Sequence, residues 1–268
     1  MEPIPGYRLR QVLGRGGFAE VWEAEAASGT VALKFMPCSD GLAAAKEIRS
    51  IQAVKSIEHP NLIKIEQVWA YQDYIVIAME LADGSLLDLL DAYTSEFGTP
   101  MAAEQVCLYL NQAAEAIDFM NRRQHLLDGQ RVGFQHCDIK PSNLLLFGDS
   151  VKVADFGLAS PTASVLRFHR RAGTLDFTAP EVFQGRLSDW TDQYALAVTY
   201  CQLRGGRMPF TDTPANFVRT YVRPNPDLTM LPSNERPVVQ RALSPTPQNR
   251  WPSCKELMTR LTKLVLKS

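Results

Sequence analysis

The sequence predicts an α+β protein in which a small, strand-rich lobe (residues 1–82) precedes a larger, mainly helical lobe (residues 83–268). Three observations lead to this class. Short segments of apolar and polar alternation fill the first 80 residues, helical periodicity dominates the rest, and the turn-forming pair Asp83-Gly84 separates the two. With 268 residues, 46% of them hydrophobic, the chain is long enough to bury a sizeable core.

Five strands and one helix are expected in the small lobe, and the strands are expected to form an antiparallel sheet. The strands are Tyr7–Leu13, Ala19–Glu25, Thr30–Met36, Leu62–Ala70 and Tyr74–Glu80. The helix is Leu42–Lys55, in which apolar residues recur at helical spacing. Short turns at Ala26–Gly29 and Gln72–Asp73 join two of the strand pairs, which is typical of hairpins.

The large lobe is expected to contain one short hairpin and several helices. The hairpin joins Leu144–Phe147 to Val151–Ala154 through Gly148–Asp149. The helices are Met101–Gln124, Thr191–Leu203, Phe217–Val222, Pro237–Leu243 and Ser253–Val265. Between them, Asp155 to Pro180 is expected to be a long loop, and loops of this length inside a compact domain are usually functional.

Charge and cysteine content exclude several protein classes. A net charge of −1 argues against a general nucleic-acid binder, which would carry a basic face. The five cysteines are scattered without a C-x-x-C pair, which argues against a zinc site and a disulfide framework and favours a reducing, cytoplasmic compartment. No apolar run approaches the length of a membrane helix, and residues 1–10 do not resemble a signal peptide.

A glycine-rich turn, Gly14-Arg15-Gly16-Gly17-Phe18-Ala19, lies between two expected strands. Small residues there would let backbone N–H groups approach phosphate oxygens, although most such turns only connect strands. A strand rather than a helix follows, which disfavours a dinucleotide-binding turn. Lys34 in the next strand and Glu47 on the following helix could form an ion pair, although each alone is more often simply solvated.

The segment His136-Cys137-Asp138-Ile139-Lys140-Pro141-Ser142-Asn143 carries the strongest chemical signal. It places a candidate base, a cation and a neutral metal ligand on one loop, which are the functions that phosphoryl transfer requires. Asp155-Phe156-Gly157 follows twelve residues after Asn143 and offers a carboxylate for magnesium. We interpret His136 as a buried structural residue, because Asp138 is better placed to accept a hydroxyl proton.

Together these motifs resemble the eukaryotic-type serine/threonine protein kinase catalytic domain, from about Tyr7 to Val265. The resemblance includes Val31-Ala32-Leu33-Lys34 and Ala179-Pro180-Glu181, in the family's order. It implies a bilobal kinase fold and a phosphotransferase that uses ATP and Mg²⁺ on protein substrates. The short length and the His-Cys-Asp sequence look like bacterial relatives of the family.

The resemblance assigns one set of residues to the phosphates of ATP. Gly14, Gly16 and Val21 would cover the nucleotide. Lys34 would hold the α- and β-phosphates and pair with Glu47. In this family the protein contributes positioning and charge stabilisation more than bond making.

A second set is assigned to the adenine ring. Ala32 and Leu145 would sandwich the ring from its two faces, and Met79 would gate the pocket behind it. The backbone of Glu80 and Ala82 would hydrogen-bond the adenine edge.

The catalytic and metal-binding roles follow in the same way. Asp138 would be the catalytic base, and Lys140 would neutralise charge on the transferred phosphoryl group. Asn143 and Asp155 would bind the magnesium ions. Lys140, with Gly173-Thr174 further along, resembles serine/threonine rather than tyrosine kinases, and Thr174 would contact Asp138 and Lys140.

Two further contacts are implied in the large lobe. Glu181 would pair with Arg250, and Asp192 would anchor the catalytic loop from its helix. The segment Gly173–Glu181 resembles the part of the family that docks a peptide substrate.

Two features depart from the family. Cys137 replaces an arginine that usually pairs with a phosphate on the loop Asp155–Glu181, so this loop is expected to need no phosphorylation. The stretch Arg122–Phe134 is longer than usual, which favours a surface hairpin around Asp128-Gly129 over a docking site.

Two alternative functions remain open from the sequence. A pseudokinase acting as a scaffold is disfavoured because Lys34, Asp138, Asn143 and Asp155 are all present. A small-molecule phosphotransferase could share the His-x-Asp loop, but the docking-like segment Gly173–Glu181 favours a protein substrate.

Overall fold

The computed structural model describes residues 4–16, 19–38, 45, 48, 51–52, 55, 57–127, 129–156, 159–162, 175–211, 213–214 and 218–267. The chain divides into two compact units. Unit 1 comprises Met1–Glu58 and Leu62–Asp83, and unit 2 comprises His59–Asn61 and Gly84–Ser268. Unit 1 is built mainly from strands and unit 2 mainly from helices, which confirms the expected α+β class.

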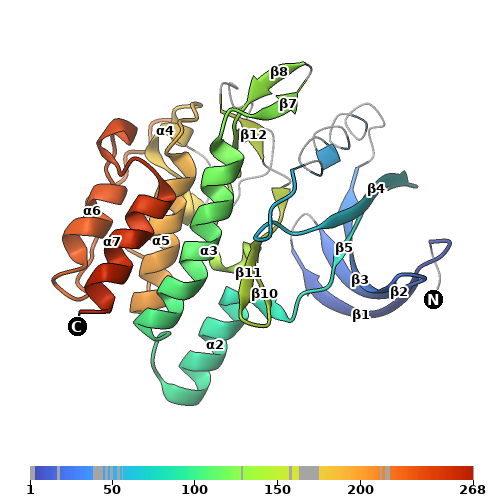
Figure 1. The fold of residues 1–268 in the computed structure, drawn as a ribbon, viewed down its shortest axis with the longest axis horizontal. Helices are drawn as coiled ribbons and strands as arrows, with labels where there is room; N and C mark the ends of the chain where they lie inside the picture. Colours follow the sequence, from blue (N-terminus) through green and yellow to red (C-terminus); the bar gives the residue numbers. More distant parts are fainter. Residues whose placement is uncertain are drawn as a thin grey trace. The chain divides into compact units, whose positions relative to one another are not determined.

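Unit 1 contains a five-stranded antiparallel sheet, drawn in blue to teal in Figure 1. Its strands are β1 (Arg8–Arg15), β2 (Glu20–Ala26), β3 (Gly29–Pro37), β4 (Ile65–Tyr71) and β5 (Tyr74–Glu80). They lie in the order β1-β2-β3-β5-β4. The five strands agree with those expected from the sequence, except that β4 begins three residues later than Leu62.

Tight turns fix the register of this sheet. Ala26 pairs with Gly29 across the β2–β3 hairpin, and Tyr71 pairs with Tyr74 across the β4–β5 hairpin. Gly29 has a φ of 120° and Gln72 a φ of 49°, so both turns use the left-handed region that short hairpins require. Both hairpins lie where the sequence predicted turns.

One face of the unit 1 sheet packs into a small apolar core. The core consists of Ile4, Ala24, Val31, Leu33, Val76 and Ala78. Because side chains alternate along a strand, the intervening residues of β3 and β5 belong to the opposite face. Where the helix was expected, the described residues 45, 48, 51, 52 and 55 are helical, whereas Glu47 lies outside the described residues.

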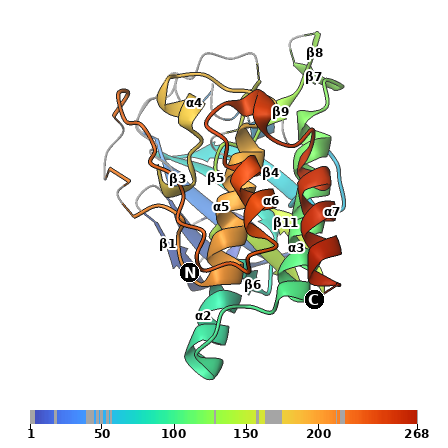
Figure 2. The ribbon, with the colours of Figure 1, turned by 90° about the vertical axis from the view of Figure 1, so that its left-hand side faces the viewer.

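Unit 2 is mainly helical, and its principal helices α3, α5 and α7 lie side by side in both views (Figures 1 and 2). Its α-helices are α2 (Leu86–Phe97), α3 (Ala103–Asn121), α4 (Pro180–Phe183), α5 (Thr191–Gly205), α6 (Arg236–Ala242) and α7 (Cys254–Val265). Its 3₁₀ turns are η1 (Pro141–Asn143), η3 (Leu175–Phe177) and η4 (Pro247–Asn249). None of the helices built from described residues is long and apolar enough to cross a membrane.

Helix α5 is the centre of unit 2. From Thr191 to Leu203 every residue but one is buried, including Tyr194 and Tyr200. A helix that is buried on all sides belongs to the interior of a domain. It contacts α3, α6 and α7, and it ends at Gly206, which adopts the left-handed conformation (φ 71°) typical of a helix C-terminus. Anything attached to α5 is therefore held by the core.

Short strands complete unit 2. β6 (Gly84–Ser85), β10 (Leu144–Phe147) and β11 (Ser150–Val153) form a three-stranded sheet in the order β11-β10-β6. β9 (Phe134–Gln135) pairs with β12 (Ser160–Pro161), and β7 (His125–Leu127) pairs with β8 (Gln130–Val132). The β7–β8 pair is the hairpin that the long stretch Arg122–Phe134 predicted, with Gly129 in the left-handed conformation (φ 77°).

One helix expected from the sequence is absent from the part of the chain that the structure describes, and one helix of the structure was not among the expected elements. Residues 218–222 form a turn closed by Tyr221 N–H donating to Val218 O at 3.0 Å, so the helix expected at Phe217–Val222 is absent from its described part. Pro224 follows Arg223, and a residue before proline disfavours helical dihedrals. Helix α2, unassigned from sequence, begins at a capping box formed by Ser85 and Asp88.

Candidate active site

In unit 1, four residues assigned to the nucleotide lie on one face of the sheet. Val21 pairs with Lys34, and Ala32 pairs with Met79. Directly paired residues of antiparallel strands point to the same face, as do residues two apart in one strand. Val21, Ala32, Lys34 and Met79 therefore share the face opposite the apolar core.

The glycine-rich turn continues this face at the β1–β2 hairpin. Gly14 pairs with Val21, and Gly16 N–H donates to Ala19 O at 2.8 Å. A Cβ added at Gly14 would meet no protein atom within 4 Å, and one added at Gly16 would meet only Ala19 O, at 3.7 Å. Packing within the protein therefore does not require glycine at either position, which suits a site where a ligand approaches the backbone.

The end of β5 carries the residues assigned to the adenine edge. Glu80 N–H donates to Lys64 O at 3.2 Å, and the Glu80 carboxylate accepts from Lys64 N–H at 2.7 Å. Because this N–H is used within the sheet, a contact between Glu80 and adenine would have to use its carbonyl oxygen. Ala82 follows in the short stretch without regular secondary structure before β6.

In unit 2, Asp192 anchors the catalytic loop from the first turn of α5. Its Oδ2 accepts from His136 N–H at 2.6 Å and its Oδ1 from Cys137 N–H at 2.9 Å. Burial raises the pKa of the Asp192 carboxyl, while the two backbone N–H donors oppose the rise. The loop is thereby attached to the most buried helix of the unit, as expected from the sequence.

The ring of His136 is part of the loop's support. It is fully buried, its Nδ1 accepts from Asp138 N–H at 3.3 Å, and its Nε2 lies 2.9 Å from Ala154 O. These partners assign the neutral tautomer with the proton on Nε2. The His136 ring also packs edge-on against the Phe156 ring, with 5.3 Å between the two ring centroids. These contacts are those of a structural residue, in line with the interpretation of His136.

Two polar side chains of the loop, those of Lys140 and Asn143, converge on the Asp138 carboxylate. Lys140 Nζ lies 2.9 Å from Asp138 Oδ2, and Asn143 Nδ2 donates to the same oxygen at 2.9 Å. Asn143 Nδ2 also donates to the Asp138 carbonyl at 2.8 Å. The Asp138 side chain is 10% exposed and that of Lys140 18%, so both contacts are largely shielded from solvent. The arrangement fixes the orientation of Asp138.

The β10–β11 hairpin brings the two assigned metal ligands to the same end. Leu144 pairs with Val153, and Ala154 N–H donates to Asn143 O at 2.9 Å, so Asn143 lies beside the residue that precedes Asp155. Since Asn143 Nδ2 faces Asp138, its Oδ1 is the atom suited to a cation. One amide oxygen and one carboxylate, completed by phosphate oxygens, match the ligands that Mg²⁺ prefers. Among the described residues, no group of three His, Cys, Asp or Glu forms an alternative metal site.

Two non-glycine residues of this loop region adopt left-handed backbone conformations. Cys137 has a φ of 67° and Asp155 a φ of 68°. Such conformations cost free energy in residues other than glycine and concentrate at functional sites. Cys137 directly precedes Asp138, and Asp155 is itself an assigned metal ligand. We therefore infer that these backbone conformations orient the Asp138 and Asp155 carboxylates.

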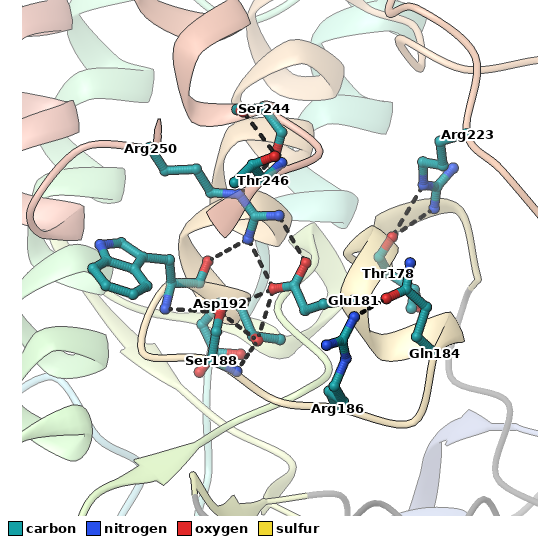
Figure 3. Close-up of polar contacts among 12 residues, drawn as sticks. Thr178, Glu181, Gln184, Arg186, Ser188, Asp192, Arg223, Ser244, Thr246 and Arg250 are labelled. Atoms are coloured by element: carbon teal, nitrogen blue, oxygen red, sulfur yellow. Dashed lines mark hydrogen bonds and ion pairs between the residues drawn. The ribbon is translucent and has the colours of Figure 1, made fainter. Parts of the chain in front are cut away.

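Glu181 and Arg250 form the buried ion pair that the resemblance implied (Figure 3). Arg250 donates from Nη1 to Oε1 at 2.9 Å and from Nη2 to Oε2 at 2.7 Å. The Arg250 side chain is completely buried and that of Glu181 is 6% exposed. Ser188 and Thr191 donate to Oε1 as well, each at 3.0 Å. The carboxylate is therefore fully satisfied, which a buried charge requires.

Comparison with known protein families identifies the family of this chain. Residues 7–267 match the model described as "Protein kinase domain". This chain is a member of the protein kinase domain family. The resemblance seen in the sequence and the expected fold are both confirmed.

Curated relatives of the kinase domain include proteins from rice and from bacteria. The chain is 33% identical to rice CBL-interacting protein kinase 4 over 265 residues, which is 93% of this chain and 56% of that protein. It is 26% identical to the probable serine/threonine-protein kinase PknB of Lactococcus lactis, covering 94% of this chain and 41% of that protein. It is 27% identical to serine/threonine-protein kinase PknF of Mycobacterium tuberculosis, covering 93% and 54%. The chain thus spans about half the length of these relatives.

Some assigned residues of the kinase domain lie outside the described residues. They are Glu47, Gly157, Gly173 and Thr174. Lys34 belongs to unit 1, whereas Asp138, Asn143 and Asp155 belong to unit 2. Leu145, assigned to adenine, also belongs to unit 2, where it pairs with Ser85 and Lys152.

Sequence reasoning missed a second support of the catalytic loop. Gln135 is buried, donates from Nε2 to Asn121 Oδ1 at 2.7 Å, and accepts from Asp192 N–H at 3.2 Å. Asn121 in turn donates to Asp189 O at 2.6 Å. The only signal in the sequence is the position of Gln135 next to the motif, which does not distinguish it from a surface residue.

Proposed function

We propose that this kinase domain transfers the γ-phosphoryl group of ATP to a serine or threonine hydroxyl of a protein substrate. The observation that carries the proposal is the convergence of Lys140 and Asn143 on Asp138, each within 2.9 Å of Oδ2. Because Oδ2 holds these two contacts, we assign Oδ1 to the incoming hydroxyl group. The names of the relatives support the serine/threonine class.

In the proposed reaction, the substrate hydroxyl oxygen attacks the γ-phosphorus as its proton passes to the Asp138 carboxylate. The bond between the γ-phosphorus and the β–γ bridging oxygen breaks, and ADP leaves. Lys140, already beside Asp138, would neutralise charge on the transferred group. The residues do little covalent chemistry themselves, since positioning and charge stabilisation account for most of the catalysis in this reaction type.

Asn143 and Asp155 are the proposed magnesium ligands of unit 2. Their two side-chain oxygens would hold Mg²⁺, whose positive charge would offset the negative charge of the phosphates. In unit 1, we propose that Lys34 holds the phosphates, Gly14, Gly16 and Val21 cover the nucleotide, and Glu47 pairs with Lys34. Ala32, Met79 and Leu145 would contact the adenine ring, with the backbone of Glu80 and Ala82 at its edge. We further propose that the protein works in the cytoplasm, where its five free thiols would remain reduced.

The product of the reaction distinguishes the proposal from its alternatives. The domain is incubated with Mg²⁺ and γ-labelled ATP alone, with dephosphorylated casein, and with a panel of small alcohols and amines. Label recovered as phosphoserine or phosphothreonine after acid hydrolysis supports the proposal, and chelating Mg²⁺ should abolish it. Label only on small molecules indicates a small-molecule phosphotransferase. Nucleotide binding without transfer to any acceptor indicates a pseudokinase.

A further inference from the structure

Arg223 makes a dense set of contacts with the segment that precedes α4. This segment, residues 175–178, is called the docking segment below, because it lies within the stretch that resembles the peptide-docking part of the family. Arg223 Nε donates to Thr178 O at 3.0 Å, and Nη2 donates to Thr178 O and Asp176 O, both at 2.9 Å, and to Leu175 O. Figure 3 shows the guanidinium facing the Thr178 carbonyl.

The rest of the guanidinium is also engaged. Nη1 donates to Thr213 Oγ1 at 3.1 Å. The cation lies over aromatic rings, closest to Phe210, whose centroid is 4.6 Å away, and also near Phe183, Tyr194 and Tyr221. Aromatic faces attract cations, so the ring cluster and the carbonyl oxygens together hold the guanidinium in one place.

The contacts of Arg223 tie the docking segment to rigid parts of unit 2. Tyr194 belongs to α5, the buried central helix, and Phe183 belongs to α4. Leu175 and Phe177 of the docking segment are themselves buried. Pro224 follows Arg223 and restricts its backbone to extended conformations. The three carbonyl groups are therefore held by a side chain with little freedom of its own.

The partners of Arg223 are backbone carbonyl groups, one hydroxyl group and aromatic rings. Cys137 stands where the family usually has an arginine for a loop phosphate, and a thiol has no positive charge to pair with such a phosphate. The planar fork of Arg223 instead satisfies backbone carbonyl oxygens, a role that arginine performs and lysine cannot reproduce.

We propose that Arg223 is the positioning residue that holds the docking segment in its substrate-binding conformation without phosphorylation. The proposal rests on the proposed function, since it assigns this segment to the protein substrate. It predicts that Arg223 controls the affinity for the protein substrate and not that for ATP.

The test compares Arg223→Gln, Arg223→Lys and the control Arg241→Gln in the full chain. Arg241 is matched chemically, because its guanidinium carbon lies 3.9 Å from the Trp251 ring centroid and it donates to the Asn249 and Arg250 carbonyls, which are outside the docking segment. Steady-state kinetics are measured with a serine peptide selected from a positional library, and hydrogen exchange is followed at the amides of residues 175–178.

For Arg223→Gln we expect the peptide KM to rise roughly tenfold or more, the scale of one lost charge-assisted hydrogen bond. The KM for ATP should stay within about twofold, and exchange in the docking segment should accelerate. Arg223→Lys should raise the peptide KM nearly as much as Arg223→Gln does. Arg241→Gln should change neither the peptide KM nor hydrogen exchange in the docking segment.

Three outcomes would contradict either the positioning role of Arg223 or the proposed function. Unchanged peptide KM and unchanged exchange in Arg223→Gln would overturn the positioning role. An equal rise of both KM values would also overturn it, because it would indicate a general loss of structure. If the wild type phosphorylates no peptide, the proposed function fails, and hydrogen exchange alone then decides whether Arg223 holds the segment.

Discussion

Asp138 shows how single side chains prepare the chemistry of this kinase domain. Its backbone N–H is held by the His136 ring, and its Oδ2 by Lys140 and Asn143. The preceding residue, Cys137, has a left-handed backbone conformation. Its N–H donates to the buried Asp192 carboxylate, which holds it in that conformation. Orientation is thereby set before any substrate binds, which is the main contribution a protein makes to phosphoryl transfer.

Gly14 provides a test of the proposed nucleotide face at the residue scale. Because a Cβ would meet no protein atom within 4 Å, Gly14→Val should leave the melting temperature nearly unchanged. The added side chain should obstruct a nucleotide and weaken Mg-ADP binding roughly tenfold, or about 1.4 kcal/mol. Calorimetric titration with Mg-ADP and thermal unfolding measure the two effects.

Gly29→Ala is the matched control for this test. Gly29 has a φ of 120°, so an alanine there should lower the melting temperature through backbone strain and leave nucleotide affinity unchanged. If Gly14→Val binds Mg-ADP as tightly as the wild type, Gly14 does not face the nucleotide.

At the scale of elements, the structure shows which parts the sequence could predict. The β2–β3 and β4–β5 hairpins were predictable because turn residues and alternation agree locally. The expected helix at Phe217–Val222 was wrong because a short apolar pattern cannot outweigh the proline-rich stretch that follows it. The role of Arg223 was not predictable, because its carbonyl partners lie 45 to 48 residues away in the sequence and depend on the path of the chain.

The segment that contains α4 depends on the pairing of Glu181 with Arg250. Breaking this buried pair with Arg250→Met leaves an uncompensated carboxylate and should cost about 3–5 kcal/mol of stability. Lys255→Gln is the control, since Lys255 pairs with Glu115 at 2.7 Å but is 60% exposed, and exposed pairs contribute about 0–1 kcal/mol. Urea denaturation measures the free energy of unfolding of both variants. Equal losses in the two variants would show that burial adds nothing to the contribution of the Glu181–Arg250 pair.

At the scale of the whole molecule, each unit carries a different part of the proposed machinery. Unit 1 presents Val21, Ala32, Lys34 and Met79 on one sheet face, and unit 2 presents the catalytic loop and the docking segment. The motif residues could be found in the sequence because they carry the chemistry. The support supplied by Gln135 could not, since a single buried amide leaves no pattern in the sequence.

Regulation is expected to be independent of loop phosphorylation. Changing Ser160, Thr162 and Ser164, the last of which lies outside the described residues, together to alanine should leave peptide phosphorylation within about twofold of the wild type. The reason is that hydrogen bonds from Arg223 hold the docking segment and Cys137 has no positive charge for a loop phosphate. A small loss of stability is expected, because Thr162 Oγ1 donates to Gly133 O at 3.1 Å. Steady-state assays of the triple variant check this, and a loss of most activity would refute it.

The most direct test of the catalytic assignment is the single-turnover rate of phosphoryl transfer in Asp138→Asn at saturating Mg-ATP. Asp149→Asn makes the same chemical change in the exposed β10–β11 turn and serves as the control. We predict that Asp138→Asn lowers the rate by roughly 10²–10⁴-fold, the usual contribution of a general base, while Mg-ADP affinity and the control rate stay within about twofold of the wild type. A wild-type rate in Asp138→Asn would contradict the account.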